Sequence, residues 1–157
     1  MNKGFTLIEL LVVSGIIIVL GGIGVVSYNR FNQSRLTRNI AEDIISGLRV
    51  AQNNAQSGKK SNVCVDTPLD GWQIDLSAGL NIKEICGAET TTAINLGSFP
   101  ADFSVTSVPA SFIFLSPSGT TDLASDILIT VTGSDGDEVI VKVTRSGEIG
   151  FPSPSST

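Results

Sequence analysis

The stretch FTLIELLVVSGIIIVLGGIGVV, residues 5–26, decides the architecture of this chain. Glu9 is its one charged side chain in 22 residues. As a helix that rises 1.5 Å per residue, the stretch would be ~33 Å long, which matches the hydrocarbon core of a bilayer. A cleaved secretory signal would have a shorter apolar region followed by a small-residue cleavage site. We therefore expect residues 5–26 to form a transmembrane helix.

A second helical pattern follows directly, and it is amphipathic. Its apolar positions recur every three or four residues and are Leu36, Ile40, Ala41, Ile44, Ile45, Leu48, Ala51 and Ala55. The chain has no proline before Pro68, and Gly58 followed by two lysines is a typical helix end. We expect one helix over residues 5–57, in which residues 27–58 pack on a globular head.

The rest of the chain changes to the two-residue period of β-strands. Short strands are predicted at 62–66, 72–76, 93–97, 111–115, 127–132, 138–144 and 148–151. Turn-forming clusters of Gly, Pro, Ser and Asp separate them. The sequence thus predicts an α+β fold, in which a long N-terminal helix packs on an antiparallel β-rich head over residues 59–151. Residues 152–157 are expected to be a flexible tail.

Composition excludes several classes of function. The chain has no histidine, so Ser–His–Asp and Cys–His catalysis and histidine-ligated metal sites are ruled out. Residues 61–157 contain twelve acidic and three basic side chains, which should repel a phosphate backbone. We expect no enzyme activity, no cofactor and no metal, and we regard nucleic acid as an unfavourable partner.

The two cysteines, Cys64 and Cys86, are 22 positions apart and fit no zinc-binding pattern. In an oxidising compartment such a pair forms a disulfide. Two buried free thiols are the alternative.

The N-terminus MNKGFTLIELLVV resembles the leader of type IV pilins and type II secretion pseudopilins. The resemblance implies that a prepilin peptidase cuts between Gly4 and Phe5 and methylates the new amino group of Phe5. Residues 1–4 are then the leader. It also implies that Glu9 pairs with the Phe5 amine of a neighbouring subunit, which would neutralise a carboxylate in lipid and set the register of a filament. A protonated Glu9 that only tolerates the membrane is the alternative.

Orientation and location also follow from the resemblance. The positive-inside rule by itself would place the head in the cytoplasm, because Arg30, Arg35 and Arg38 follow the span and Lys3 alone precedes it. The resemblance implies instead a single-pass protein of the inner membrane with an extracytoplasmic head, which later joins a periplasmic or extracellular filament. Its implied partners are other pilin subunits, the peptidase, the inner-membrane assembly platform and membrane lipid.

The head is similar to GspH/FimT-like minor pseudopilins in the order of its motifs. These are a cysteine after the helix, Gly71-Trp72, FLSPSG at 114–119 and RSGEI at 145–149. A structural, minor subunit of a type II secretion pseudopilus or a type IV pilus is the function this implies. The alternative is a FimT-like pilin whose head binds DNA or another surface ligand, although Lys142 and Arg145 lie among acidic residues here.

Three local features leave more than one interpretation. Arg30, Arg35 and Arg38 suit anionic lipid headgroups, acidic heads of neighbouring subunits, or a solvated helix face. The sequence DGDE at 135–138 lacks the ligand spacing of an EF-hand, so we expect a hairpin turn there and not a calcium loop. Trp72 is expected to cover the core where the helix meets the sheet, with a surface binding role as the alternative.

Overall fold

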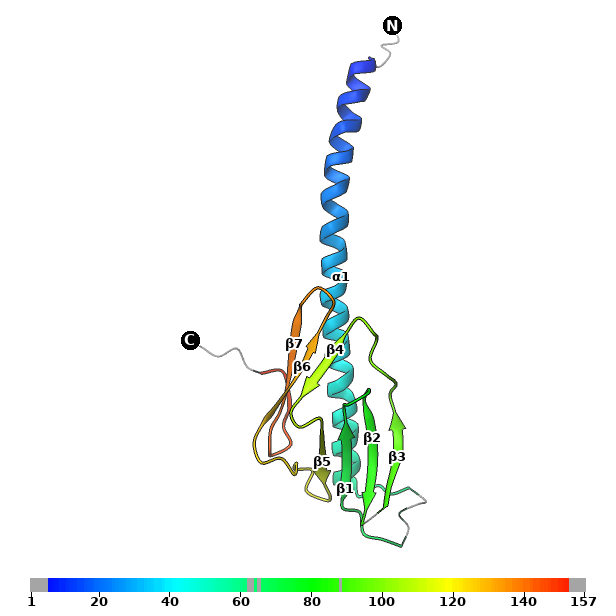
Figure 1. Cartoon of the computed structure of the whole chain (residues 1–157), viewed down its shortest axis with the longest axis vertical. Helices are drawn as coiled ribbons and strands as arrows, with labels where there is room; N and C mark the ends of the chain where they lie inside the picture. The colour runs from blue at the N-terminus through cyan, green and yellow to red at the C-terminus, as the bar shows by residue number, and fades with distance from the viewer. Residues whose placement is uncertain (1–5, 62–63, 65, 88, 153–157) are drawn as a thin grey trace.

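The computed structural model describes residues 6–61, 64, 66–87 and 89–152, apart from the side chains of residues 21–27, 29–30, 89 and 92–93. It contains one helix, α1 (Leu7–Ser57), and eight strands (Figure 1). The strands are β1 (Gly71–Asp75), β2 (Asn81–Cys86), β3 (Glu89–Asn95), β4 (Ser104–Ser107), β5 (Ser111–Leu115), β6 (Ile127–Thr132), β7 (Glu138–Val143) and β8 (Ile149–Gly150). The predicted α+β fold, with an N-terminal helix packed on antiparallel sheets, is confirmed.

Both ends of α1 are capped by the chain itself. The hydroxyl of Thr6 accepts a hydrogen bond from the N–H of Glu9 at 3.4 Å, as an N-cap does. At the other end Gly58 adopts φ 62°, the left-handed conformation in which a side chain is unfavourable. The N–H of Lys59 then returns to the carbonyl of Asn54 at 3.0 Å. Gly58 therefore ends the helix as predicted.

The first part of α1 extends away from the head, as Figure 1 shows. Its large apolar side chains are exposed, and they are Leu7, Ile8, Leu10, Leu11, Val12, Val13, Ile16, Ile17, Ile18, Val19 and Leu20. Over the described residues, no helical stretch combines the length and the apolar character that a membrane crossing requires. The expected span also includes Phe5 and the side chains of residues 21–26, which lie outside the description.

The second part of α1 is built into the core of the head. It contacts β1 and β5 of one sheet and β6, β7 and β8 of the other. The helix contributes the buried residues Ala41, Ile44, Ile45, Leu48, Ala51 and Ala55. These are six of the eight predicted stripe positions; Ile40 is half-buried and Leu36 remains 39% exposed. The apolar stripe thus decides which side of α1 faces the sheets.

Two four-stranded sheets lie along one side of this helix (Figure 1). The first has the strand order β3-β2-β1-β5 and the second β4-β6-β7-β8, and all pairs are antiparallel. The inward side chains of the first sheet include Trp72, Ile74, Ile82, Phe112 and Phe114, and those of the second include Ile129, Val131, Val141 and Val143. Trp72 is 3% exposed, so its predicted place in the core is confirmed.

The strands predicted at 72–76 and from residue 111 onward match observed strands to within one residue at each end, whereas the prediction at 62–66 is wrong and that at 93–97 is displaced. Cys64 lies in a 3₁₀ turn and not in a strand, while residues 62, 63 and 65 of that predicted strand lie outside the description. The strand expected at 93–97 is β3, which begins four residues earlier and ends at Asn95. Strands β2 and β4 were not predicted at all.

The sequence of β2 explains why it escapes a period-two search. Its inward positions are Ile82, Glu84 and Cys86, and Ile85 faces outward. A carboxylate on the buried face and an isoleucine on the other face cancel the alternation of apolar and polar residues. Strand β4 has only four residues, three of them Ser or Thr, and so gives little apolar signal.

Candidate functional site

The candidate site is the surface that runs along α1, because the helix presents apolar side chains at one end and charged side chains beside the head. Glu9 is exposed in the first turns of the helix, surrounded by exposed apolar residues. In the part of the chain that the structure describes, the Glu9 carboxylate makes no ion pair. Gly4 and Phe5, the predicted cleavage and methylation positions, lie outside the described residues.

A carboxylate in this position is chemically unusual. Apolar helix surface gains free energy when lipid or another apolar helix covers it, whereas burial of an unpaired carboxylate costs free energy. Any partner that covers the Leu7–Leu20 surface must therefore protonate Glu9, hydrogen-bond it or supply a cation.

Beside the head, arginine side chains lie along the exposed face of α1. The guanidinium of Arg35 lies 4.3 Å from the centre of the Phe31 ring. That of Arg38 forms an ion pair with Glu42, at 3.0 Å, and lies 5.2 Å from the centre of the Phe151 ring. The side chain of Arg30 lies outside the description. Arg35 and Arg38 are both exposed, so their charges are accessible from solvent.

The head is fixed to α1 by a side chain that the sequence did not single out. The amide nitrogen of Gln52 donates to the carbonyl oxygens of Gly119, at 3.1 Å, and Gly147, at 2.6 Å. Gly119 belongs to the turn after β5 and Gly147 to the turn between β7 and β8. One helix residue thus holds a turn from each sheet. The signal that could have found it is a glutamine on the buried stripe between Leu48 and Ala55.

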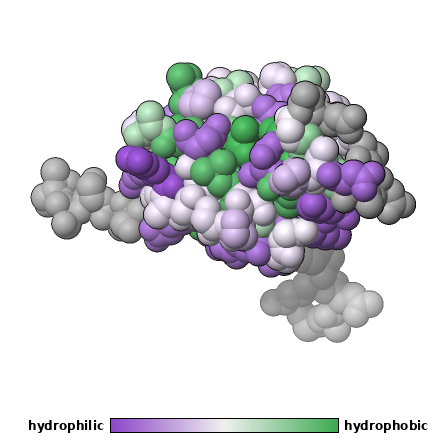
Figure 2. All heavy atoms as spheres, turned by 90° about the horizontal axis from the view of Figure 1, so that it is seen from below, coloured by the Kyte–Doolittle hydropathy of each residue, from purple (hydrophilic) through white to green (hydrophobic). Residues whose placement is uncertain are grey.

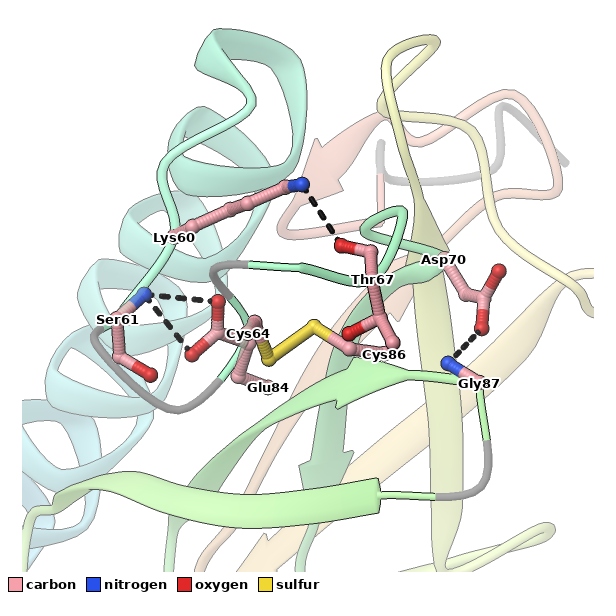
Figure 3. Close-up of a disulfide and its surroundings, with 8 residues drawn as sticks. All are labelled: Lys60, Ser61, Cys64, Thr67, Asp70, Glu84, Cys86 and Gly87. Carbon is pink, nitrogen blue, oxygen red and sulfur yellow. Dashed lines mark hydrogen bonds between the residues drawn. A yellow bond between two sulfur atoms is a disulfide. The ribbon is translucent and has the colours of Figure 1, made fainter.

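A disulfide joins Cys64 and Cys86, the pair for which the sequence predicts one; their Cα atoms are 5.9 Å apart (Figure 3). Both cysteines are buried. The bond ties the segment that follows α1 to the end of β2. It therefore holds the end of the helix against the first sheet.

Glu84 strengthens this attachment. Its side chain is fully buried beside the disulfide, and both carboxylate oxygens accept from the N–H of Ser61, at 2.9 and 3.1 Å (Figure 3). Nearby, the ammonium of Lys60 donates to the carbonyl of Thr67 at 2.8 Å. Buried carboxylates in proteins require such partners. Glu84 thus has a structural role that a search for strand periodicity cannot anticipate.

Two ion pairs on the head shift the pKa values of their members. The ammonium of Lys83 hydrogen-bonds Asp75 at 2.7 Å, and this bond, with others from Ser77, lowers the pKa of Asp75 from 3.8 to about 2. Lys142 hydrogen-bonds Asp126 at 2.9 Å, which lowers the pKa of Asp126 and raises that of Lys142. One of the two cations near the C-terminus is therefore already engaged by an acidic neighbour.

The segment 135–138 is part of a hairpin turn, as predicted. The N–H of Gly133 donates to the carbonyl of Asp137 at 2.9 Å, and the N–H of Gly136 to that of Gly133 at 3.0 Å. This turn connects β6 and β7.

At the opposite end of the head, apolar and polar side chains are mixed on the surface, as Figure 2 shows. Leu115, at the end of β5, is 36% exposed.

Fold and surface together define an α+β protein in which one helix serves both as the core of a head and as an exposed apolar extension. Compared with protein-family models, with curated proteins and with solved structures, the chain has no significant match.

Proposed function

We propose that the chain is a structural subunit of a pilus-type filament, either a type II secretion pseudopilus or a type IV pilus. In this proposal the helix first anchors the chain in the inner membrane with the head outside the cytoplasm. A prepilin peptidase removes residues 1–4, and the helix then packs with the helices of other subunits as the assembly platform builds the filament. The head, like that of a pilin, then forms the outer surface of the filament.

The observation that carries the proposal is the continuity of α1. One helix of 51 residues contains an exposed apolar half and a half that is part of the core of the head. Apolar surface on this scale needs a lipid or protein partner. A rigid connection between such a surface and a folded head is the arrangement that a helical filament with a central bundle of helices requires.

Glu9 supports the same function. The carboxylate lies among the side chains that a partner helix would cover, and it lacks an ion-pair partner among the described residues. The free amino group created by cleavage before Phe5 would supply the missing cation from a neighbouring subunit. The requirement for that pair would also fix the axial register between the two helices.

The competing role, DNA binding by the head, gains no support from the charges near the C-terminus. Lys142 is bound to Asp126, while Arg145 contributes only its backbone N–H, at 3.1 Å, to the same carboxylate. Of these two residues, only Arg145 keeps its side-chain charge without an ion-pair partner among the described residues. Phosphate contacts depend on free cations. The proposal includes no catalytic activity.

Assembly of the full chain tests the proposal. In a host with a prepilin peptidase and a pilus assembly machinery, the wild-type chain should appear in sheared filament fractions. Glu9→Ala should reduce that amount at least tenfold, whereas Ser14→Ala, an exposed polar change on the same helix half, should not. Absence of the wild-type chain from such fractions would contradict the filament role. Normal assembly of Glu9→Ala would refute the register role alone.

A further inference from the structure

We propose that the turn between β6 and β7 of one copy docks into a groove beside α1 of a second copy. The acidic turn consists of Asp135, Asp137 and Glu138. The helix groove is lined by Glu42, Ile45, Ser46, Arg49, Val50, Asn53, Gly150 and Phe151. This inference rests on the proposed filament function and names the surfaces through which the heads would meet.

The groove lies where α1 meets the end of β8, and its volume is about 650 Å³. Its apolar part is open to solvent, since Val50 and Phe151 are each 42% exposed. Arg38 lies at its edge, with its guanidinium over the Phe151 ring and bound to Glu42. These two contacts restrict the arginine before any partner arrives, which lowers the entropic cost of a further ion pair.

Arg49 gives the groove an available positive charge. Its side chain is exposed on the wall formed by α1. Across the described residues, no acidic group forms an ion pair with it. The groove therefore has one cation that is free and a second, Arg38, whose charge is shared with Glu42.

The acidic turn has the complementary character. All three carboxylates are exposed on a turn that two backbone hydrogen bonds close. Asp135 accepts from the hydroxyl of Ser134 at 3.1 Å, but none of the three is paired with a lysine or arginine within the described ranges. Three carboxylates on one hairpin repel one another, and a cation placed beside them would reduce that repulsion.

The positions of the two surfaces determine what such a contact would build. Gly133, at the base of the acidic turn, lies against Thr37, at the end of the head from which the apolar half of α1 extends (Figure 1). The groove is centred near Ser46, nine residues further along the helix. With a rise of 1.5 Å per residue, a second copy must be shifted by about 14 Å along parallel helices for its turn to enter the groove.

The contact is heterologous, because the turn and the groove are different surfaces of the same chain. Such contacts do not close into a two-fold dimer, and repeated with a constant axial shift they produce an open helical assembly. The second copy is shifted toward the head end of the first. Pairing of a Phe5 amine with Glu9 of a neighbouring copy would require a shift in the same direction of only four residues, about 6 Å, so it would join a different pair of copies in the assembly.

Paired cysteines test the contact in the full chain. Cys64 and Cys86 are bonded to each other, so cysteines introduced at Arg49 and Asp137 would be the free thiols. In sheared filaments treated with a mild oxidant, Arg49→Cys/Asp137→Cys should give a ladder of cross-linked multimers. Each single variant alone should give none. Arg49→Cys/Val108→Cys is the matched control, because Val108 is 88% exposed and belongs neither to the groove lining nor to the acidic turn.

The outcomes separate the inference from the proposed function. Filaments that contain the double variant without a ladder would overturn the docking contact and leave the filament role intact. Absence of wild-type filaments would defeat both. Cross-linking of the Arg49→Cys single variant to a different protein would show that the occupant is not a second copy, and this too would overturn the inference.

A charge exchange provides a second measurement without cysteines. Arg49→Glu should lower the yield of sheared filaments about fivefold, the effect of an exposed ion pair at the upper end of the usual range. Asp137→Arg in the same chain should restore most of that yield. Equal yields for wild type, Arg49→Glu and the double variant would contradict the proposed pair.

Discussion

The side-chain amide of Gln52 donates to the carbonyl oxygen of Gly147 over 2.6 Å, across 95 positions of the sequence. The same nitrogen reaches the carbonyl of Gly119 at 3.1 Å. Each sheet of the head therefore has a turn attached to one point on α1. In a filament subunit this attachment would hold both sheets of the head in a fixed position relative to the helix.

Gln52→Ala should destabilise the head by about 1–3 kcal/mol, because two partly buried carbonyl groups would lose their donor. Urea unfolding followed by circular dichroism would measure the change. Asn53→Ala is the control, since Asn53 is an exposed amide on the next residue and should change the free energy of unfolding by less than about 0.5 kcal/mol. Equal effects of the two substitutions would mean that Gln52 does not attach the sheets.

Removal of the disulfide should have a larger effect. The bond between Cys64 and Cys86 closes a loop with a sequence separation of 22 and fixes the end of α1 to β2. The double variant Cys64→Ala/Cys86→Ala should lose about 3 kcal/mol of unfolding free energy. The same loss should appear when the wild-type chain is reduced, and reduction should leave the double variant unchanged. A wild-type chain as stable when reduced as when oxidised would contradict this role.

The Asp75–Lys83 pair predicts an acid dependence of stability. The pKa of Asp75 is about 2 in the folded chain against an ordinary value of 3.8, so the carboxylate stays ionised in the fold while it takes up a proton in the unfolded state. Its contribution is present above about pH 4 and is lost as the pH falls to 2. Because the pair is partly solvated, we expect about 1 kcal/mol.

Urea unfolding of wild type and Asp75→Asn between pH 2 and 6 checks this effect. The two chains should differ above pH 4 and converge near pH 2. Asp102→Asn, a change at an exposed carboxylate, should keep the wild-type dependence. A constant difference between wild type and Asp75→Asn over the whole range would show that the pair does not depend on ionisation.

The sequence predicts the fold where hydrophobic periodicity and turn chemistry agree. This holds for the helix with its end at Gly58 and for β5, β6 and β7, whose inward residues alternate without interruption. It fails for β2, where the inward Glu84 binds the backbone of Ser61, a contact between segments far apart in the chain. Local patterns do not reveal such tertiary partners.

The same limit applies to the candidate site. The apolar helix and Glu9 are visible in the sequence because they are local features of one segment. The role of Gln52 and the groove beside Arg49 depend on residues near Gly147 and Phe151, which the fold brings to the helix. Charge patterns show three arginines after the apolar stretch and an acidic head. These patterns do not reveal which charged and apolar side chains the fold places on the same exposed surface.

The intact mass of the chain, extracted from membranes of a host with a prepilin peptidase, tests the central claim most directly. A filament subunit of this type should lack residues 1–4 and have one added methyl group on Phe5. The Cys64–Cys86 bond should also leave it two hydrogens lighter than the reduced chain. The full-length mass without methylation would contradict the proposed processing and, with it, the assignment of the helix to a pilus-type filament.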